Sequence, residues 1–411
     1  MNERHRDYAV GVVKTLRSAG YQALFAGGCV RDLLLGESPS DFDVATDATP
    51  EAVMRLFRHT VPVGVSFGVV RVIGSKEQGE IEVATFRSDG EYFDGRRPET
   101  IAFASPEVDA HRRDFTINGM FLDPINDEVI DYVGGRSDLN NRVLRAIGDP
   151  FARFREDKLR LLRAVRFAAR LGFVLDPRTE SAIREMASQI TQVSVERIVD
   201  ELRKMLVHPT RVQALEGIRN LDLLDALIPG FKGEAGGVDA LEIWNTTIQT
   251  LWALPRIVSF PLVMTALLRG LGSVEKIDSL LGTWKLSNAD RERILWLFQH
   301  EKALVEAESL PRSRLKRLLS APGVDELLDL HRAIATANWS DPRFLLYCDE
   351  YRRNLPEGPL DPPFLVTGRD LINAGLKPGP RFSTLLEQLR DAQLEGTIQT
   401  KEEGLAMILS M

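Results

Sequence analysis

The stretch GGCVRDLLLGESPSDFDVATDATP, residues 27–50, places a glycine pair before a helix-like run and then two aspartates one residue apart. Alternate side chains of a β-strand point to the same face, so Asp41 and Asp43 are expected to project together while Phe42 faces the other side. Two carboxylates on one face repel each other unless a cation lies between them. Oxygen ligands so arranged suit Mg²⁺, which completes its shell with water and phosphate oxygens.

The glycine pair fits a phosphate site next to such a cation. Without a Cβ atom, Gly27 and Gly28 let the backbone approach a triphosphate closely and offer N–H groups at the start of the following helix. Arg31 would neutralise phosphate charge there. Taken alone, a D-x-D motif recurs by chance, and a turn followed by a solvated strand end is the alternative.

Length and composition indicate a multidomain, soluble protein. The chain has 411 residues, of which 44% are hydrophobic and 27% charged, and this length predicts two to four domains. No apolar run reaches the roughly 18 residues of a membrane span, and the opening MNERHRDYAV lacks a signal-peptide core, so we expect a cytoplasmic protein with no membrane partner. Cys29 and Cys348 lie far apart in the sequence and form no disulfide framework, which agrees with a reducing compartment. The net charge of −7 argues mildly against coating nucleic acid but allows a local basic channel. The sequence does not reveal the oligomeric state.

The pattern of apolar residues changes near residue 150. Before it, β-rich runs alternate with the helical run 49–60, which predicts an α/β domain with a mixed sheet; the β-rich runs are 21–28, 66–74, 79–87 and 119–135. After it, apolar residues recur at helical spacing, as in 156–173, 196–207 and 214–228. A turn-rich stretch, 352–368, precedes the last helical segment.

The pattern G-G-x-V-R-D-x-L-L-G followed by D-F-D resembles the active-site signature of class II nucleotidyltransferases, the branch of tRNA nucleotidyltransferases (CCA-adding enzymes) and bacterial poly(A) polymerases. Further motifs of that family follow in order at 81–103, 112–118, 148–173, 194–206, 367–382 and 393–396. The resemblance implies an α/β nucleotidyltransferase head with a mixed sheet, followed by all-α neck, body and tail domains. The corresponding boundaries are 1–145, 146–207, 208–335 and 336–411.

The motif RRDFTIN, residues 112–118, is similar to the family's ribose-binding motif. The resemblance implies that Arg113 and Asp114 grip the sugar and phosphates, with the carboxylate accepting from the ribose 2′-hydroxyl, and that Asn118 supports this loop. An ordinary surface ion pair is the alternative for an isolated R-R-D.

The motif EDKLR, residues 156–160, resembles the family's base-selecting segment. Asp157 and Arg160 are three residues apart, so on a helix they would share one face and act as one hydrogen-bonding edge; a helical salt bridge is the alternative. The resemblance implies that this pair selects CTP and ATP and that Glu156 orients it. Cytosine and adenine each offer an amine donor beside a ring-nitrogen acceptor, whereas uracil and guanine reverse both.

The implied reaction extends a tRNA 3′ end from CTP and ATP. Two Mg²⁺ ions at Asp41 and Asp43 would lower the pKa of the RNA 3′-hydroxyl, align it with the α-phosphate and stabilise the leaving pyrophosphate. Glu82, on a neighbouring strand, is either a third metal ligand or a structural residue.

Two sequence features help to distinguish CCA-adding enzymes from the other members of this family. Val65 and Ser66 stand where poly(A) polymerases tend to carry a basic pair, which favours CCA addition; poly(A) polymerase remains the alternative. The loop DGEYFDGRRP, residues 89–98, is intact, whereas enzymes that add only the two cytidines usually lack much of it. Addition of CCA and addition of the terminal A alone both stay open.

In the helical body, residues 240–272 resemble a segment that in some relatives carries a His-Asp phosphohydrolase site. Here Arg269-Gly270 replaces the His-Asp pair and Thr246 replaces the earlier histidine, so we predict no such activity.

For RNA contact, residues 151–170 hold seven Arg or Lys against two acids, and 311–319 hold four basic residues and no acid. With residues 377–382, these are candidates for a discontinuous basic track that binds the shape and phosphates of a tRNA.

Overall fold

The computed structural model describes residues 2–64, 67–90, 101–231, 240–355, 358–379 and 381–409. The chain divides into two compact units, one made of residues 1–205 and 213–229 and the other of residues 206–212 and 230–411. The four domain boundaries expected from the sequence are finer than this division and remain predictions.

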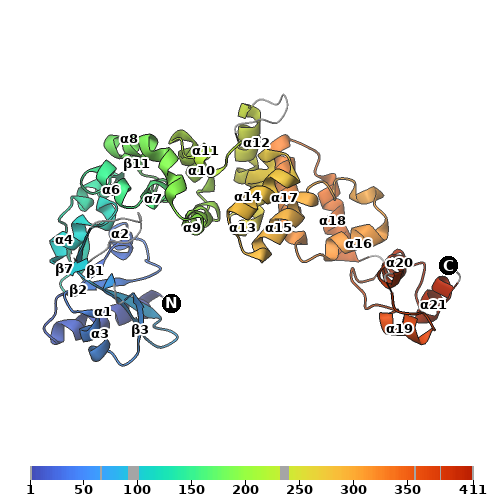
Figure 1. Ribbon diagram of the computed structural model, residues 1–411, viewed down its shortest axis with the longest axis horizontal. Coiled ribbons are helices and arrows are strands. Elements are labelled where there is room, and N and C mark those ends of the chain that lie inside the picture. The colour runs from blue at the N-terminus through green and yellow to red at the C-terminus, as the bar shows by residue number, and fades with distance from the viewer. Residues whose placement is uncertain are drawn as a thin grey trace. The chain divides into compact units, whose positions relative to one another are not determined.

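The first unit contains a seven-stranded mixed sheet (Figure 1). Its strand order is β3 (Thr60–Gly64), β4 (Val69–Ile73), β5 (Glu80–Thr85), β2 (Asp43–Thr46), β1 (Ala23–Ala26), β8 (Phe121–Asp123) and β9 (Glu128–Ile130). Strands β2 and β5 run parallel, with Asp43 opposite Glu82, and the other neighbouring pairs are antiparallel. The predicted mixed sheet is therefore confirmed, and each predicted β-rich run contains at least one of these strands.

Helices α1 (Asn2–Ser18) and α3 (Pro50–Leu56) cover one face of the sheet (Figure 1). Helix α3 begins where the Thr49 side chain accepts from the Ala52 amide and Pro50 fills the first helical position. It ends before the predicted residue 60 because Thr60 starts strand β3. Strand side chains such as Phe25, Val44 and Val83 are buried beneath these helices.

Helices complete the first unit. They are α2 (Gly28–Leu34), α4 (Pro106–His111), α5 (Gly135–Asn140), α6 (Pro150–Glu156), α7 (Leu159–Leu171), α8 (Pro177–Met186), α9 (Val195–Leu206), α10 (Arg211–Asn220) and α11 (Leu224–Leu227), of which α9 and α10 each run partly into the second unit. Helix α7 ends at Gly172, whose φ of 66° suits a residue without Cβ. The helical run predicted over 214–228 is instead divided between α10 and α11, and Asp222 between them adopts a φ of 61°.

The described residues of the second unit are helical apart from turns and loops. Their longer helices are α12 (Ala240–Ala253), α13 (Phe260–Leu268), α14 (Val274–Thr283), α15 (Asn288–Gln299), α16 (Arg312–Ser320), α17 (Val324–Asn338) and α18 (Arg343–Asn354). Helix α13 has the sequence FPLVMTALL and lies in the core, where all its residues except Pro261 are buried. The boundary predicted between residues 335 and 336 falls within α17.

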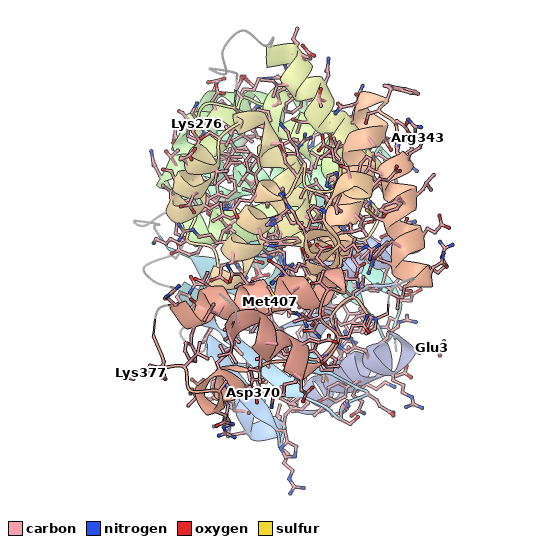
Figure 2. The ribbon with its side chains drawn as sticks, turned by 90° about the vertical axis from the view of Figure 1, so that its right-hand side faces the viewer. Glu3, Lys276, Arg343, Asp370, Lys377 and Met407 are labelled. Atoms are coloured by element: carbon pink, nitrogen blue, oxygen red, sulfur yellow. The ribbon has the colours of Figure 1, made fainter. Side chains whose placement is uncertain are left out.

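The last three helices, α19 (Gly368–Asn373), α20 (Arg381–Glu395) and α21 (Lys401–Leu409), share their own apolar cluster. The cluster contains Val366, Leu371, Leu389, Ala392, Ile398 and Ile408. In Figure 2, Asp370 on α19 and Met407 on α21 lie in this group, and exposed Lys377 projects from the loop before α20. Within the described residues, no helix is long and apolar enough to cross a membrane.

Candidate active site

A cleft of about 420 Å³ in the first unit gathers most of the residues singled out from the sequence. It is lined by Gly27, Gly28, Arg31, Asp43, Arg112, Arg113, Asp114, Asn118, Asp157, Arg160, Arg163 and Phe167. Of the predicted site residues, only Asp41, Glu82 and Glu156 are outside this lining. Segments more than 100 residues apart in the chain therefore form one site.

Gly27 occupies the turn between strand β1 and helix α2. Its backbone has φ of 74° and ψ of −133°, a conformation that is essentially open only to glycine. A Cβ atom added there would lie 3.1 Å from Nη1 of Arg113 and 3.8 Å from Oδ2 of Asp43. The lack of a side chain at Gly27 thus leaves open the space between Asp43, a predicted metal ligand, and Arg113.

The two aspartates alternate with buried residues as predicted. Asp41 and Asp43 are exposed, whereas Phe42 and Val44 are buried. Burial by surrounding protein atoms, together with the nearby Glu82 carboxylate, raises the pKa of Asp43 to about 6, and Arg113 opposes the shift. Asp43 nevertheless keeps part of its surface exposed to solvent and lines the cleft.

The donor set at this edge fits a hard divalent cation held by two carboxylates. Burial and the neighbouring carboxylates raise the pKa of Asp43, and a bound cation would favour its charged form. Mg²⁺ commonly takes only one or two protein carboxylates and fills its shell with water and phosphate oxygens. Glu82 is opposite Asp43 on strand β5 but pairs with Arg71, whose Nε lies 3.1 Å from its Oε1. In the described residues no cluster of three or more His, Cys, Asp or Glu ligands is formed.

A chain of buried hydrogen bonds joins helix α2 to the sugar motif. Arg31 is 3% exposed and donates from Nη1 to Oδ1 of Asn118 at 2.8 Å, while its Nε and Nη2 bind Asp32. Asn118 in turn donates from Nδ2 to Oδ1 of Asp114 at 3.1 Å. The predicted supporting role of Asn118 thus has a geometric basis: its side chain links Arg31, expected to bind phosphate, to Asp114, expected to bind the sugar.

Asp114 is the most strongly held carboxylate of the cleft. Burial alone would raise its pKa, but the Arg163 guanidinium and the bonds from Arg163 and Asn118 lower the pKa to about 2. Its Oδ2 accepts from Nε and Nη2 of Arg163 at 2.9 and 2.5 Å, and its Oδ1 also accepts from the Phe115 amide at 2.8 Å. Since each carboxylate oxygen has two lone pairs, these bonds use the full acceptor capacity of Asp114.

Asp157 and Arg160, the predicted base-selecting pair, line the cleft but do not lie on one helix. Helix α6 ends at Glu156, and Asp157 is extended, with φ of −147° and ψ of 103°, before α7 begins at Leu159. The expectation that Asp157 and Arg160 share a continuous helical face is therefore wrong. The Asp157 Oδ1 atom instead accepts from the Leu159 amide at 3.0 Å, which favours the helix start over continuation of α6.

Glu156 contacts Arg160 but not Asp157, and its role in orienting the pair stays a prediction. Its Oε2 accepts from Nη1 of Arg160 at 2.6 Å and from Nη1 of Arg153 at 2.9 Å. Arg160 also donates to the backbone carbonyl oxygens of Arg153 and Arg112. These bonds hold the guanidinium plane while leaving its Nε without a partner among the described residues.

Sequence reasoning missed Arg163 and Phe167. Both are on α7, one and two turns beyond Arg160, and Phe167 has three guanidinium groups near its ring: Arg31, Arg163 and Arg166 lie 5.2, 5.3 and 4.4 Å from its centroid. The signal available in the sequence was the spacing of Arg160, Arg163 and Phe167, which places them on adjacent faces of one helix. Only the packing of α7 against residues 112–118 shows that this face lines the cleft.

Two sequence features for the family branch, Val65-Ser66 and most of the 89–98 loop, lie outside the described residues. In the second unit, Thr246 and Arg269-Gly270 line one small pocket, so the altered positions of the former His-Asp segment do come together. There Arg269 donates from Nε to Glu301 at 2.8 Å.

The predicted basic track is only partly exposed. Lys316 is buried, and Arg317 binds Glu387 and Asp391 of helix α20, so these two side chains stabilise the second unit rather than face RNA. Within 151–170, Arg160, Arg163 and Arg166 are also committed to carboxylates. The number of basic side chains available to RNA was overestimated, because the sequence shows the charged residues but not their ion-pair partners.

Comparisons with known proteins agree with this site. The family described as "Poly A polymerase head domain" matches residues 23–145, and "Probable RNA and SrmB- binding site of polymerase A" matches residues 172–234. The CCA-adding enzyme of Bacillus subtilis is 35% identical over 404 residues, covering 97% of this chain and 96% of that protein. That of Lactobacillus gasseri is 32% identical, covering 98% and 96%. This chain belongs to the family of CCA-adding enzymes.

Solved structures of CCA-adding enzymes share its fold. The crystal structure of the Bacillus stearothermophilus CCA-adding enzyme in complex with CTP has a TM-score of 0.80 and 30% identity, and the match covers 100% of this chain and 98% of that one. The Thermotoga maritima CCA-adding enzyme complexed with tRNA has a TM-score of 0.66 at 21% identity, which shows a common fold. The predicted fold class, an α/β head followed by helical domains, is confirmed.

Proposed function

We propose that this chain adds CCA, or its terminal A, to tRNA 3′ ends from CTP and ATP without a nucleic-acid template. The observation that carries the proposal is the cleft in which the phosphate-side residues Gly27, Gly28 and Arg31, the metal-side Asp43 and the base-side Asp157 and Arg160 converge. Membership in the CCA-adding family, at 32–35% identity over nearly the whole chain, supports this activity over poly(A) synthesis.

The phosphate and sugar end of the substrate lies between the glycine turn and the 112–118 motif. Gly27 and Gly28 let the triphosphate approach the backbone, and Arg31 and Arg113 supply positive charge. Asp114 and Asn118 form the sugar side of the cleft, where Asp114 is held by Asn118 and Arg163. The linked bonds from Arg31 through Asn118 to Asp114 preorganise both regions, so binding the nucleotide requires little rearrangement.

Asp41 and Asp43 are the residues that would hold Mg²⁺. Bound there, the metal would increase the acidity of the RNA 3′-hydroxyl and neutralise charge on the α-phosphate and pyrophosphate. The protein itself keeps both carboxylates exposed. It also leaves the space beside Asp43 open, because Gly27 has no side chain to fill it.

The base end is read by Asp157 and Arg160. A carboxylate accepts from the amine of cytosine or adenine, and a guanidinium donates to the neighbouring ring nitrogen. Uracil and guanine would face each group with the wrong polarity, and each unpaired contact costs about 1–3 kcal/mol. Because Asp157 and Arg160 are anchored by Arg197 and Glu156, the protein itself serves as the template.

The decisive experiment uses purified protein, Mg²⁺ and three tRNA transcripts that end before CCA, after the first C and after CC, with CTP and ATP supplied separately and together. Growth of the first transcript by three nucleotides followed by arrest would establish full CCA addition. Growth of the CC-ending transcript alone, by one A, would define an A-adding enzyme. An unarrested ladder of A residues would overturn the proposal in favour of poly(A) synthesis.

The two cysteines bear on the compartment in which the reaction takes place. Cys29 and Cys348 are both free and buried, in keeping with a reducing compartment, and we therefore place the activity in the cytoplasm.

A further inference from the structure

Three charged side chains stand in a row across the sheet beside the predicted metal site. Arg71 on strand β4 is directly opposite Glu82 on β5, and Glu82 is directly opposite Asp43 on β2. All three belong to the same, solvent-facing side of the sheet, because the residues next to them along each strand are buried. Neighbouring strands lie about 4.8 Å apart, so Glu82 has an opposite charge on one side and a like charge on the other.

The Glu82 carboxylate is turned toward Arg71. Its Oε1 accepts from Nε of Arg71 at 3.1 Å, and Nη1 of the same arginine lies 3.1 Å from Oε1 of Glu80. One guanidinium therefore holds two carboxylates of strand β5. In the part of the chain that the structure describes, no three His, Cys, Asp or Glu side chains are placed to hold one metal ion, so Glu82 does not join Asp41 and Asp43 in this arrangement.

Glu82 is nevertheless within reach of the metal site. Its negative charge contributes to the raised pKa of Asp43. Among the described residues, its Oε2 has no hydrogen-bond partner. Since Arg71 and Asp43 are on the two strands that flank β5, rotation about the side-chain bonds of Glu82 brings its carboxylate toward either one without any movement of the backbone.

The ion pair that holds Glu82 is weak enough to be broken by a cation. The side chains of Arg71 and Glu82 are 34% and 47% exposed, and ion pairs so open to water change an equilibrium constant only about two- to fivefold. A divalent cation at Asp41 and Asp43 would place two positive charges on the other side of the Glu82 carboxylate, against the single charge of Arg71.

We propose that Arg71 and a divalent cation bound at Asp41 and Asp43 compete for Glu82. Glu82 is then a reserve ligand, available to the cation only when its pair with Arg71 opens, and Arg71 weakens cation binding. This inference rests on the proposed function, because it takes Asp41 and Asp43 as the metal ligands. Arg71 is a positioning residue, since it acts on the cation through Glu82.

The test measures binding of Mn²⁺ to the full chain without nucleotide or RNA, from the electron paramagnetic resonance signal of the free ion. It compares wild type, Arg71→Met, Glu82→Gln and the double variant. Methionine keeps an apolar stem but removes the charge and the donors, so we expect Arg71→Met to lower the Kd for Mn²⁺ about two- to fivefold. On the Glu82→Gln background the same substitution should change the Kd less than about 1.5-fold, because the carboxylate that it would release is absent.

Three controls separate this effect from a general change of charge. Arg55→Met removes an exposed arginine from helix α3 of the same unit and should keep the wild-type Kd. Glu80→Gln removes the other carboxylate that Arg71 holds and should not tighten Mn²⁺ binding. Asp43→Asn gives the Kd expected when a proposed metal ligand is lost. In tRNA extension at saturating CTP, the half-saturating Mg²⁺ concentration should fall in Arg71→Met by the same factor as the Kd for Mn²⁺.

Three results would overturn the inference. Equal tightening by Arg71→Met with and without Glu82 would show that the lost charge acts directly on the cation. A Kd for Arg71→Met no lower than that for Arg55→Met would show that Arg71 has no effect. A Kd for Glu82→Gln as high as that for Asp43→Asn would make Glu82 a full ligand already in the wild-type chain.

Thermal unfolding of each variant identifies a folding defect, and Arg71→Gln repeats the test if the methionine variant is unstable. The Mn²⁺ titration also separates the two hypotheses, because it contains no RNA. A chain that shows the dependence on Glu82 but extends no tRNA would contradict only the proposed function. A chain that extends tRNA without this dependence would contradict only the competition for Glu82.

Discussion

The guanidinium of Arg197 donates from Nη2 to Oδ2 of Asp157 at 2.7 Å. Arg197 belongs to helix α9, whereas Asp157 is the extended residue between α6 and α7. The contact therefore compensates for the helix break, because it fixes a carboxylate that no helical backbone restrains. Among the described residues, Oδ1 of Asp157 has one hydrogen-bond partner, the Leu159 amide, so this oxygen keeps capacity to accept from a base.

Arg197→Met should weaken base selection without removing catalysis. With its orienting partner lost, Asp157 should sample several rotamers, and we expect the ratio of kcat/KM for CTP over UTP to fall about 5- to 20-fold. The measurement is steady-state incorporation into a tRNA that ends before CCA. Arg184→Met, which removes a half-exposed ion pair with Glu180 on helix α8, is the control and should keep the wild-type ratio.

Arg160→Ala should affect nucleotide choice more severely. The variant removes the proposed donor to the base and also leaves Glu156 without one of its two arginine partners. We expect discrimination against UTP and GTP to drop by about 1–3 kcal/mol, which is roughly 5- to 150-fold. Single-nucleotide incorporation with each of the four triphosphates measures this. Unchanged selection of CTP and ATP would contradict the assignment of Arg160 to the base.

The two aspartates of the D-x-D motif should behave differently from Glu82. Asp41→Asn and Asp43→Asn should each reduce kcat about 10³-fold or more, because each removes a proposed metal ligand. Glu82→Gln should cost at most about tenfold, since the Glu82 carboxylate already binds Arg71. Incorporation assays across a Mg²⁺ series compare the three. A loss in Glu82→Gln as large as that in Asp43→Asn would make Glu82 a third ligand.

Gly27→Ala should impair both the turn and the site. The positive φ strains any residue with a Cβ by about 1–2 kcal/mol, and the added atom would press on Arg113. Gly36→Ala is a matched control: Gly36 also has φ of 74°, but nothing lies within 4 Å of its would-be Cβ. We expect both variants to lower the thermal unfolding temperature, and only Gly27→Ala to raise the KM for CTP strongly. Equal KM values would show that the close approach has no functional effect.

His331 in the second unit should make stability depend on pH. Burial lowers its pKa from 6.5 to about 4, a shift to which Arg269 adds and which a bond to the His300 carbonyl opposes. The unfolded chain therefore binds a proton at higher pH than the folded chain. The stabilising contribution is present above about pH 6.5 and is lost as the pH falls toward 4, with a full size of about 3 kcal/mol.

Urea unfolding at pH 7.5, 6 and 5 tests this for His331→Gln. Relative to wild type, the variant should lose less stability over that range because its side chain does not titrate. His59→Gln, at an exposed position, is the control. A parallel decline in wild type and His331→Gln would exclude His331 as the source.

Several features of the fold and of the site were predicted correctly from the sequence. The alternation of Asp41, Phe42, Asp43 and Val44 follows from the two-residue period of a strand, a local property, and the structure has it as expected. The mixed sheet and the change to helices after residue 150 likewise follow from local apolar periodicity. The matched motifs also identified Gly27, Gly28, Arg31, Arg113, Asp114, Asn118, Asp157 and Arg160, all of which line one cleft.

Other features depend on contacts between distant segments. The break at Asp157 was not predicted, because the run 156–173 was interpreted as one helix and the anchoring Arg197 lies 40 residues away. Lys316 was assigned to an RNA-binding surface because its charge is visible in the sequence, whereas its burial is not. The pairing of Arg163 with Asp114 spans 49 residues and joins helix α7 to the turn after α4.

The sequence by itself thus determined the element types, the carboxylate face of the D-x-D strand and the family, because these follow from local periodicity and ordered motifs. The tertiary structure decided which charges are paired and which retain free hydrogen-bonding capacity. Those properties depend on the donors and acceptors that packing brings within about 3 Å of one another, and no local pattern encodes that distance.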